Sequence, residues 1–529
     1  MNNTIYFKRY IIAAIVIMVT SIAFAGLGCF GSEEKQTPIT SGLTVPAISE
    51  VTPKDGSSIA KTDKIIVKFI TSPYTHIDSG TLVLEGTMSG ESDGGVWSTT
   101  AVESDTLTIS PKTAWTIGTG TLTVTCKDSE GNTISTSSTE DEASSGSLTY
   151  GVQVFYVKSG KSGDGSVYNE SGDINAAVTK AAAKLKNGTW VPPAQVHVAK
   201  GTYEVTAGSS HVVMSEGVSL YGGYSDTDWA MRDPVTNTTI IKEISQTGGT
   251  GEQPNPAVEA GSAITAATVI DGFKIIGGGG DVSSCVFNHD GSALTIANNT
   301  IEAGSAALNQ GIYNLNGSSP TIYGNSIKGG SGANGSFAIY NYANSLPKIY
   351  NNIINGGEGN VAFGIYNYFK CAPTIYNNTI DGGSGAISTG IWNESESTPA
   401  IANNIISAPA STSGFGIREA NVNCSPTELR NNDIFNCKTT LYFDEGSTAI
   451  NAIAGVNALT GANANVSEDP KFGDSLHLTS TSPDAVKQGG LDGAAPAQNW
   501  GFTTDKDGKT RTGNGTTGWS MGAYEFSDQ

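Results

Sequence analysis

Short apolar segments recur along the second half of the chain with a period of about 26 residues. The clearest marker is a Gly-Ile-Tyr-Asn-like tetrad, whose isoleucines are Ile312, Ile339, Ile365, Ile391 and Ile417. A second motif, Ile-x-x-Asn-x-Ile, runs in phase with it. Each repeat holds three brief apolar segments separated by Gly, Asn and Pro, and because these segments are too short for helices, successive repeats must pair with one another. The pattern therefore predicts a parallel β-solenoid with one rung per repeat.

Stacked rungs place equivalent side chains in columns with a spacing of about 4.8 Å. Two isoleucine columns are expected to point inward: Ile322, Ile349, Ile375 and Ile401 form one, and Ile327, Ile354, Ile380 and Ile406 form the other. An asparagine recurs at the bend between them, where it can pass hydrogen bonds from amide to amide and tolerate a left-handed backbone. These asparagines are Asn299, Asn325, Asn352, Asn378, Asn404 and Asn432. The Asn-x-Thr tripeptides at Asn298 and Asn377 are interpreted as parts of this ladder rather than as glycosylation sites.

Different patterns flank the repeats. Residues 45–150 contain short β-rich runs separated by turn residues, which predicts a β-sandwich. From Asp173 to Lys186 apolar residues fall at helical spacing and Gly188 follows, so we expect a helix that caps the open end of the solenoid. The predicted organisation is a signal peptide (1–28), a flexible tether (29–44), the sandwich (45–150), the cap and first coils (151–260), the regular rungs (261–450) and a C-terminal capping region (451–529).

The N-terminus has the pattern of an export signal. Lys8 and Arg9 precede an apolar run, and Leu27-Gly28-Cys29 follows it like a bacterial lipobox, which predicts that the Cys29 thiol carries a lipid anchor. The alternative is cleavage after Ala25 by ordinary signal peptidase, which gives a secreted protein. No later segment reaches the roughly 20 continuous apolar residues of a membrane span. We therefore expect the rest of the chain to lie outside the cytoplasm, anchored to the cell envelope or surface through lipid alone, or secreted.

Composition narrows the possible partners. Of 529 residues, 66 are Gly and only 15% are charged, which excludes a coiled coil and a charged disordered chain. The net charge of −20 repels phosphate backbones, so no nucleic-acid partner is expected. After Cys29 five cysteines remain, with no C-x-x-C pair and no His at metal spacing, so we predict no metal and no cofactor. Cys371 and Cys424 lie two rungs apart, about 10 Å, and should be unbridged.

Several stretches resemble known families of exported proteins. The Ile-x-x-Asn-x-Ile repeat, with residues 196–203, 218–224 and 522–525, resembles the right-handed parallel β-helix of the pectin lyase superfamily. Residues 48–56, 107–111 and 128–132 look like a bacterial Ig-like domain of the surface-protein type. The resemblances imply an all-β protein in which an Ig-like spacer precedes the β-helix.

The resemblance to pectin lyases implies two chemistries on the solenoid. One is proton abstraction beside a uronate by Arg or Lys, with calcium held by Asp clusters, and the other uses paired carboxylates about 5 to 9.5 Å apart. The rungs contain no Asp-Asp pair, Gly-His-Gly or Asn-Thr-Asp, so the hydrolase signatures of the family are absent. Glu394, Glu396 and Glu419 either converge on one edge as a catalytic pair or are solvated loop carboxylates. His289 is expected to be a surface turn residue, and we assign no catalytic residue.

A column of aromatic side chains is the strongest candidate for a site. It follows the tetrad isoleucines by one residue and consists of Phe287, Tyr313, Tyr340, Tyr366, Trp392 and Arg418. Because Ile points inward, alternation should send these side chains outward as a ribbon of rings about 4.8 Å apart. Such rings can stack on sugar faces, and a linear ribbon suits a linear polymer. The alternatives are that the rings merely stabilise the solenoid or that they bind a protein partner.

The sequence therefore predicts a non-catalytic bacterial surface protein that binds an extracellular polysaccharide or a cell-surface glycan. Tyr313, Tyr340, Tyr366, Trp392 and Arg418 are its predicted binding residues. A polysaccharide lyase or glycoside hydrolase acting on a uronate-containing polymer is the first alternative. A purely structural or adhesive surface element is the second.

Overall fold

The computed structural model describes residues 47–54, 57–70, 77–88, 91–96, 105–111, 114–128, 131, 133–135, 148–167, 169–512 and 518–527. The predicted signal peptide, the tether and Cys29 lie outside the described residues, so their assignment stays a prediction. Within the described part, none of the helices has the length and apolar character needed to cross a membrane.

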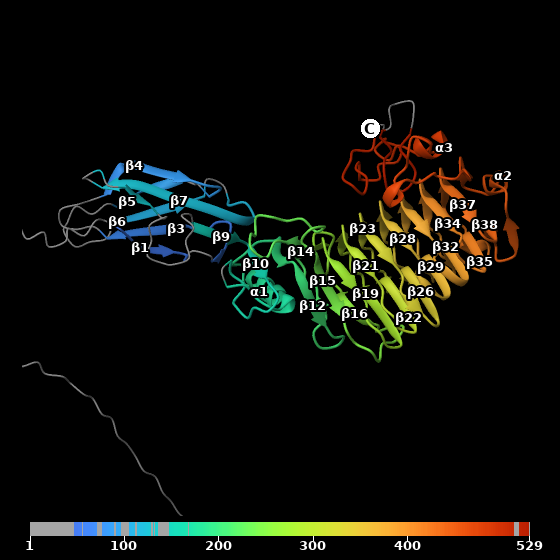
Figure 1. Cartoon of the computed structure of the whole chain (residues 1–529), viewed down its shortest axis with the longest axis horizontal. Helices are drawn as coiled ribbons and strands as arrows, with labels where there is room; N and C mark the ends of the chain where they lie inside the picture. The colour runs from blue at the N-terminus through green and yellow to red at the C-terminus, as the bar shows by residue number, and fades with distance from the viewer. Residues whose placement is uncertain are drawn as a thin grey trace, which may run out of the picture. The chain divides into compact units, whose positions relative to one another are not determined.

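From residue 154 onward the chain winds into a parallel β-helix with three long sheets (Figure 1). Each rung contributes one strand to each sheet, and equivalent strands pair in parallel with the next rung. The tetrad isoleucines are register partners, Ile339 with Ile365 and Ile365 with Ile391, so one rung takes about 26 residues. The predicted solenoid is therefore confirmed, and its period is the one expected from the repeats.

Within each of the three sheets, neighbouring strands pair in a fixed order. The first sheet consists of β10 (Val154–Val157), β11 (Ala194–Ala199), β14 (Val218–Tyr224), β17 (Val269–Asp271), β20 (Thr295–Ala297), β23 (Thr321–Tyr323), β27 (Lys348–Tyr350), β30 (Thr374–Tyr376), β33 (Ala400–Ala402), β36 (Glu428–Arg430) and β40 (Ala462–Asn463). The second sheet consists of β12 (Gly201–Val205), β15 (Thr239–Glu243), β18 (Lys274–Ile276), β21 (Thr300–Glu302), β24 (Ser326–Lys328), β28 (Ile353–Asn355), β31 (Thr379–Asp381), β34 (Ile405–Ala408) and β37 (Asp433–Cys437). The third sheet consists of β13 (Val212–Val213), β16 (Asn255–Ala260), β19 (Val282–Asn288), β22 (Leu308–Asn314), β26 (Gly335–Tyr342), β29 (Glu358–Tyr368), β32 (Ser384–Glu394), β35 (Ser413–Glu419), β38 (Thr440–Asp444) and β39 (Thr448–Ile450), with β25 (Ser331–Gly332) beside β29.

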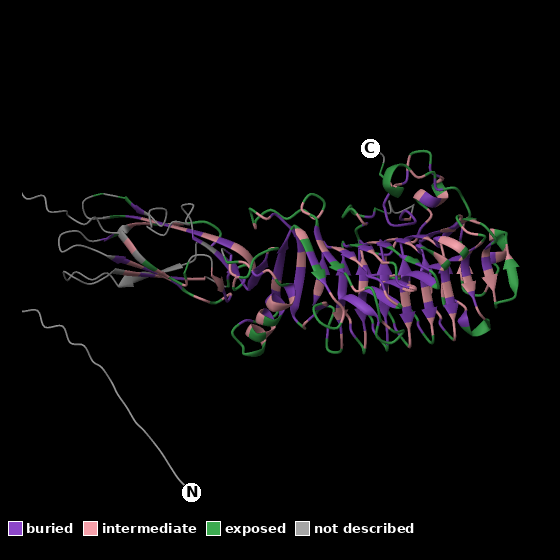
Figure 2. Cartoon of the chain, turned by 60° about the horizontal axis from the view of Figure 1, so that its bottom comes forward, coloured by how far each residue is buried: buried purple, intermediate pink, exposed green. Residues whose placement is uncertain are grey.

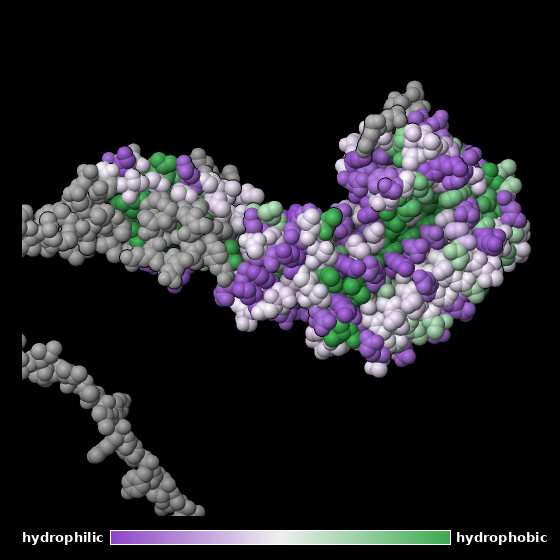
Figure 3. Space-filling view, in the orientation of Figure 1, coloured by the Kyte–Doolittle hydropathy of each residue, from purple (hydrophilic) through white to green (hydrophobic). Residues whose placement is uncertain are grey.

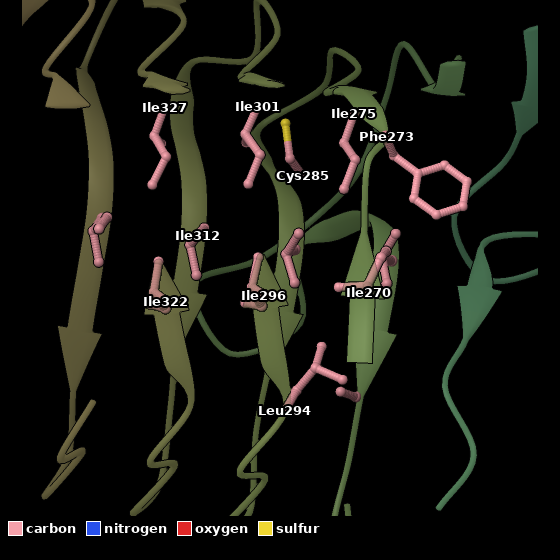
Figure 4. Close-up of a cluster of buried hydrophobic side chains, with 14 of the residues drawn as sticks. Ile270, Phe273, Ile275, Cys285, Leu294, Ile296, Ile301, Ile312, Ile322 and Ile327 are labelled. Atoms are coloured by element: carbon pink, nitrogen blue, oxygen red, sulfur yellow. The ribbon is translucent and has the colours of Figure 1, made fainter. Parts of the chain in front are cut away.

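The core consists of columns of branched aliphatic side chains. Ile270, Ile296 and Ile322 form one row and Ile275, Ile301 and Ile327 another (Figure 4), and these side chains have almost no exposed surface. Both predicted isoleucine columns are buried in the same cluster, together with the tetrad isoleucines. Buried residues follow the strands, whereas exposed residues concentrate at the turns (Figure 2). Burial of one branched side chain contributes roughly 1.5–3 kcal/mol, so the repeated columns provide most of the stability of the solenoid.

The predicted asparagine ladder is present, with one refinement. Asn325 Nδ2 donates to Asn352 Oδ1 over 3.0 Å, and Asn352 Nδ2 repeats the bond to Asn378 over 3.0 Å. The left-handed backbone, however, belongs to the residue before each ladder asparagine, as in Asn351 with φ of 55°. The same φ region holds Asn298, Gly324, Asn377, Asn403 and Asn431.

A helix covers the N-terminal end of the core. Helix α1 (Ile174–Lys186) begins after Asp173, whose Oδ1 accepts from the Ala176 N–H over 3.1 Å. Ile174, Ala177, Val178 and Ala181 are its buried residues, and they join the core cluster of the solenoid. The predicted capping helix is therefore confirmed.

The chain after the last rungs turns back along the first sheet. The helices of this part are short: α2 (Ile453–Val456), 3₁₀ helix η3 (Asp474–Leu476) and α3 (Asp484–Lys487). A further short 3₁₀ helix, η2 (Val422–Cys424), lies earlier, between β35 and β36. Phe502 stacks on Tyr350 and Trp500 stacks on Tyr376, each with ring centroids 4.2 Å apart. Apolar residues gather on the surface next to this segment in the space-filling view (Figure 3).

Residues 47–152 form two small sheets. One is antiparallel, in the order β1 (Ala47–Thr52), β3 (Ile65–Ile70), β6 (Asp105–Ser110) and β5 (Glu91–Val96). The other has the order β2 (Ser58–Ile59), β9 (Leu148–Val152), β7 (Gly118–Asp128) and β4 (Ile77–Glu85), with β8 (Thr133–Ser135) paired to β7. Val67, Leu107 and Leu122 belong to a core cluster of their own. The Ig-like assignment of these sheets stays a prediction.

No disulfide links the cysteines among the described residues. Cys126, Cys285, Cys371 and Cys424 are buried and Cys437 is half-buried. Cys371 and Cys424 are unbridged, as the rung spacing predicts. Burial raises the pKa of the Cys371 thiol to about 12, which keeps it protonated and unreactive at neutral pH.

Candidate functional site

The predicted column of rings lies on the outer side of the third sheet. Its members are register partners on successive strands from β19 to β35. The ring centroids are 5.0 Å apart between Tyr313 and Tyr340, 5.1 Å between Tyr340 and Tyr366, and 5.2 Å between Tyr366 and Trp392. Arg418 continues the column, with its guanidinium carbon 4.5 Å from the centre of the Trp392 ring. Inward-pointing Ile and outward-pointing rings alternate along each strand as expected.

The column is not the continuous exposed ribbon that the sequence predicts. Phe287 is 6% exposed and Tyr313 only 1%, because the loop of residues 247–254 crosses over them and Gly251 O accepts from the Tyr313 hydroxyl over 2.8 Å. Tyr340, Tyr366 and Trp392 are half-buried. Their faces are occupied by the neighbouring rings, so only ring edges remain for a ligand. A sugar cannot stack on this column face to face, and this part of the predicted binding mode is corrected.

Two further columns flank the rings and widen them into an aromatic face. On one side Phe337 stacks on Phe363 with centroids 5.2 Å apart, and on the other Tyr342 stacks on Tyr368 at 5.4 Å. The second pair is half-exposed, and the adjacent Phe369 is 45% exposed. We use the name aromatic face for the outer surface of the third sheet formed by Phe287, Tyr313, Phe337, Tyr340, Tyr342, Phe363, Tyr366, Tyr368, Phe369 and Trp392.

Phe369 occupies an unusual backbone position. In each rung the strand of the third sheet is followed by a turn, which begins after an inward-pointing asparagine. The second residue after this asparagine has a positive φ. Phe369 has φ of 62°, and Asn316 and Ala343 take the same position in the preceding rungs. A left-handed backbone is costly for a bulky residue, and such strain occurs most often at functional sites. The turn therefore holds an exposed ring at a position where a small or amide side chain fits with less strain.

An open cleft of about 970 Å³ lies beside the aromatic face. Residues of the 247–254 loop form one wall, and the turns at the ends of β19, β22, β26 and β29 form the other. Phe287, Leu315, Tyr342 and Phe369 are its apolar lining. Because the lining residues run from Glu259 on β16 to Phe369 after β29, the cleft extends along the solenoid axis over about 19 Å at the usual strand spacing. A cleft of this length and volume can accept several units of a linear ligand.

A hydrogen-bonded cluster of His and carboxylate side chains closes one end of the cleft. Glu259 Oε2 accepts from His211 Nε2 over 2.7 Å, and Glu259 Oε1 accepts from His289 Nε2 over 3.1 Å. Asp290 Oδ2 accepts from His289 Nδ1 over 2.9 Å, and His289 stacks on Phe287 with ring centroids 4.8 Å apart. His289 does lie at a turn, as predicted, but it is part of this network rather than an isolated surface residue.

The hydrogen bonds of the cluster orient its two histidines. His211 Nδ1 accepts from the Gly208 N–H over 3.2 Å, so Nε2 is the nitrogen that donates to Glu259. His289 faces a carboxylate at each ring nitrogen, and its bond with Glu259 is the main cause of its raised pKa. The same bonds, with His211 first, lower the pKa of Glu259 to about 2. The cluster therefore holds an ionised Glu259 carboxylate between two imidazole rings.

The three carboxylates considered as a catalytic pair are directed to different places. Glu394 accepts from the Tyr366 hydroxyl over 2.7 Å on the outer face, and Glu396 lies at the turn, 3.6 Å from Lys370 Nζ. Glu419 is register partner of the inward-pointing Asn393 and is 1% exposed. Because Glu419 faces the core while Glu394 and Glu396 lie on the outer surface, Glu419 cannot act on one substrate together with either of them.

The sequence predicts some residues of the site but not others. Tyr342 and Tyr368 follow the tetrad isoleucine by three residues, so the repeat places them beside the predicted column. His211 and Glu259 lie outside the regular repeats and 48 residues apart, and no local motif joins them. Across the residues described, no group of three or more His, Cys, Asp or Glu side chains is arranged to hold a metal ion.

Comparisons with known proteins agree with this fold. Residues 270–469 match the family model described as right handed beta helix region. The A-module of a mannuronan C-5 epimerase from Azotobacter vinelandii is 14% identical, with 56% of this chain and 95% of that chain covered and a TM-score of 0.24. A family 28 exopolygalacturonase from Yersinia enterocolitica is 9% identical, with 76% and 96% covered and a TM-score of 0.25. No curated protein matches the chain. The solenoid is a right-handed parallel β-helix.

Proposed function

We propose that the β-helix is a binding surface for an extended glycan, which lies along the cleft beside the aromatic face. The observation that carries this proposal is the exposed ring of Phe369, held on a strained turn above a long cleft that Tyr342 also lines. Sugar rings have apolar faces and polar edges, so they fit a wall of aromatic rings with hydrogen-bonding groups nearby. The length of the cleft suits a linear polymer rather than a single small molecule.

Binding rather than catalysis is favoured by the placement of the candidate carboxylates. Glu394 and Glu396 are engaged with Tyr366 and Lys370 on the surface, while Glu419 is buried in the core. A glycosidase needs two carboxyl groups facing one bond, about 5 to 9.5 Å apart. We therefore propose a non-catalytic protein, with the half-buried edges of Tyr340, Tyr366 and Trp392 as a secondary contact surface.

The test is retention of the protein on immobilised polysaccharides. Phe369→Ala and Tyr342→Ala should weaken binding tenfold or more, about 1.4 kcal/mol each, because the apolar wall of the cleft is lost. Tyr323→Ala is a matched control, since Tyr323 is also half-exposed and stacked on a neighbour, Tyr350 at 5.1 Å, but lies on the first sheet. Equal retention of all three variants would contradict the proposal.

The same preparations test for enzymatic activity. Incubation with uronate polymers should give no rise in the absorbance of unsaturated product, and incubation with neutral polymers should release no reducing ends. Release of either product would replace the binding proposal with a polysaccharide lyase or a glycoside hydrolase. Alanine in place of Tyr340, Tyr366 or Trp392 is less informative, because removal of a stacked, half-buried ring leaves a cavity that also costs stability.

We also propose that the protein is exported and held at the bacterial cell surface by a lipid on Cys29. The basic and apolar N-terminal pattern and the lipobox-like Leu27-Gly28-Cys29 support this proposal. The Cys29→Ser variant should lose metabolic labelling with a fatty acid and move to the soluble fraction. A mature N-terminus at Gly26 would instead show cleavage by ordinary signal peptidase.

A further inference from the structure

The charged groups that line the cleft are of one sign. Glu252, Glu259 and Asp290 contribute carboxylates, and among the lining residues, all within the described part of the chain, there is no Lys or Arg. The lining also contains His211 and His289, whose ring nitrogens face Glu259 and, for His289, Asp290 as well. Even with both imidazoles protonated, their two positive charges would not balance the three carboxylates. The cleft therefore has a negative potential at neutral pH.

The carboxylate of Glu259 retains capacity for a ligand. A carboxylate has about four lone-pair sites, and each Glu259 oxygen accepts one hydrogen bond from a histidine. Its side chain is 29% exposed, at the end of the cleft rather than in the core. Two adjacent hydroxyls of a pyranose ring can donate to the two oxygens of one carboxylate, whereas a sugar carboxylate has no proton to donate at neutral pH. The histidines fix the orientation of the Glu259 side chain, which reduces the entropy lost on binding.

We propose that this cleft selects an uncharged pyranose chain and excludes uronate polymers, with Glu259 as the group that hydrogen-bonds the hydroxyls of a sugar unit at the closed end. The inference rests on the proposed glycan-binding function and adds the class of ligand. It combines three features of the same cleft: the apolar wall of Phe369 and Tyr342, the lining of carboxylates, and the oriented Glu259. The net charge of −20 for the whole chain adds long-range repulsion of polyanions.

The test is a glycan array that contains neutral and acidic oligosaccharides of equal length. Neutral members are glucans, mannans, xylans and galactans, and acidic members are oligogalacturonates and alginate fragments. The full chain should be retained by at least one neutral member and by no acidic member. Raising the salt concentration to 0.5 M, which screens the repulsion, should leave neutral binding within twofold.

Variants of the cleft identify the recognising group. Glu259→Gln should reduce binding of the retained neutral glycan tenfold or more, because one strong acceptor becomes a donor. Glu358→Gln is the matched control: Glu358 is also a carboxylate on the solenoid surface, 63% exposed and 3.6 Å from Lys328, but it lies at the start of β29, away from the cleft. The control should bind within twofold of the wild type. The midpoint of thermal unfolding of each variant shows that the chain remains folded.

Each outcome decides the inference. Retention by acidic members overturns the ligand class but leaves glycan binding in place. Retention by neutral members with unchanged binding of Glu259→Gln overturns the role of Glu259. Absence of retention by every member overturns both the inference and the proposed function. Loss of binding in Phe369→Ala together with normal binding in Glu259→Gln supports the proposed function alone.

Discussion

At the bend between the first and second sheets most rungs carry two consecutive asparagines, and the two meet different physical demands. The first, such as Asn351, takes the left-handed backbone that the bend requires, a conformation in which Asn and Gly are favoured. The second, such as Asn352, turns its amide into the core edge and satisfies backbone carbonyls of its own rung and the previous one. Gly324 replaces the first asparagine in one rung, so in that rung the backbone conformation alone is sufficient.

This division predicts unequal effects of substitution. Asn352→Ala removes three donated bonds, to Ile322 O, Tyr350 O and Asn378 Oδ1, and leaves buried carbonyls without donors. We expect a loss of about 2–4 kcal/mol in the free energy of unfolding, since each unsatisfied buried group costs about 1–3 kcal/mol. Asn298→Gly should cost less than about 1 kcal/mol, because the position is exposed and Gly324 occupies its equivalent. Denaturant unfolding measures the free energy of unfolding of both variants. Equal losses of stability in the two variants would contradict the different roles of the two asparagines.

The cluster at the end of the cleft gives a pH dependence with a defined sign. The raised pKa of His289 means that its contribution to stability is complete below about pH 6.5 and lost as the pH rises through its folded value. The lowered pKa of Glu259, about 2, means that its contribution is complete above about pH 4.5 and lost on acidification toward pH 2. The stabilising contributions of His289 and Glu259 are both complete between about pH 4.5 and 6.5.

Titration of His289 by NMR checks this arrangement. The Glu259→Gln variant should move the pKa of His289 downward toward the ordinary histidine value, because the variant removes the charge and weakens the bond that raise it. Asp290→Asn should shift it in the same direction but less, since the bond with Asp290 is the smaller cause. An unchanged His289 pKa in Glu259→Gln would mean that the two side chains are apart in solution.

At the scale of elements, the third sheet has two faces with different ladders. Outside are the aromatic columns, and inside an amide ladder connects Asn314, Asn341 and Asn367, with each Nδ2 donating to the next Oδ1 over 2.7–2.9 Å. The ladder ends where β35 places Glu419 in register with Asn393. Asn393 Nδ2 and Glu419 Oε2 are both buried without a hydrogen-bond partner among the described residues. Desolvation of this carboxyl raises its pKa to about 7.

We therefore expect the ionised Glu419 carboxylate to lower the free energy of unfolding above neutral pH. Its folded pKa of about 7 lies above the usual value, so stability is highest when the carboxyl is protonated and falls as the pH rises through 7. Glu419→Gln should keep an amide at the end of the ladder and reduce the loss of stability between pH 5 and 8. The buried Asp433, also with a pKa of about 7, remains in both proteins, so the loss should shrink rather than vanish. If the free energy of unfolding depends on pH equally in the wild type and in the variant, this account is wrong.

The sequence determines the regular part of the solenoid because the same physical demand recurs in every rung. Ile339, Asn352 and Tyr340 have equivalents one period away, so a single sequence reveals their columns and their alternation. The asparagines of the inner ladder also recur in the sequence, where each is the last residue of a Gly-Ile-Tyr-Asn-like tetrad. What the period does not contain is the loop of residues 247–254, which covers Tyr313, or the contact of His211 with Glu259. These are single long-range contacts, set by packing rather than by repetition.

On the scale of the whole molecule, a solenoid has nearest-neighbour stability, because each rung contacts only the rungs beside it. The C-terminal segment departs from this rule. It lies across several rungs of the first sheet, with Lys506 Nζ donating to Gly324 O over 2.6 Å and Asn403 Nδ2 donating to Leu491 O over 2.8 Å. Contacts that span many rungs couple them, so the segment should make unfolding of the rungs from β23 to β33 more cooperative.

Arg511 is the single side chain on which the position of this segment depends most. It is 4% exposed and pairs with Glu525 over 3.1 Å, while its other nitrogen donates to Asn351 Oδ1 over 2.8 Å. Arg511→Met would remove the bond to the rung and leave the Glu525 carboxylate buried without its cation, a change that typically costs about 3–5 kcal/mol. Because the rungs have a core of their own, the segment should detach while the solenoid stays folded, and limited proteolysis should then cleave between residues 466 and 512 at least tenfold faster. Lys471→Met is the control within the same segment, since its pair with Asp469 is solvent-exposed and contributes little to stability. If Arg511→Met and Lys471→Met are cleaved at the same rate, the segment is held by its aromatic contacts, with Phe502 on Tyr350 and Trp500 on Tyr376, and not by the buried arginine.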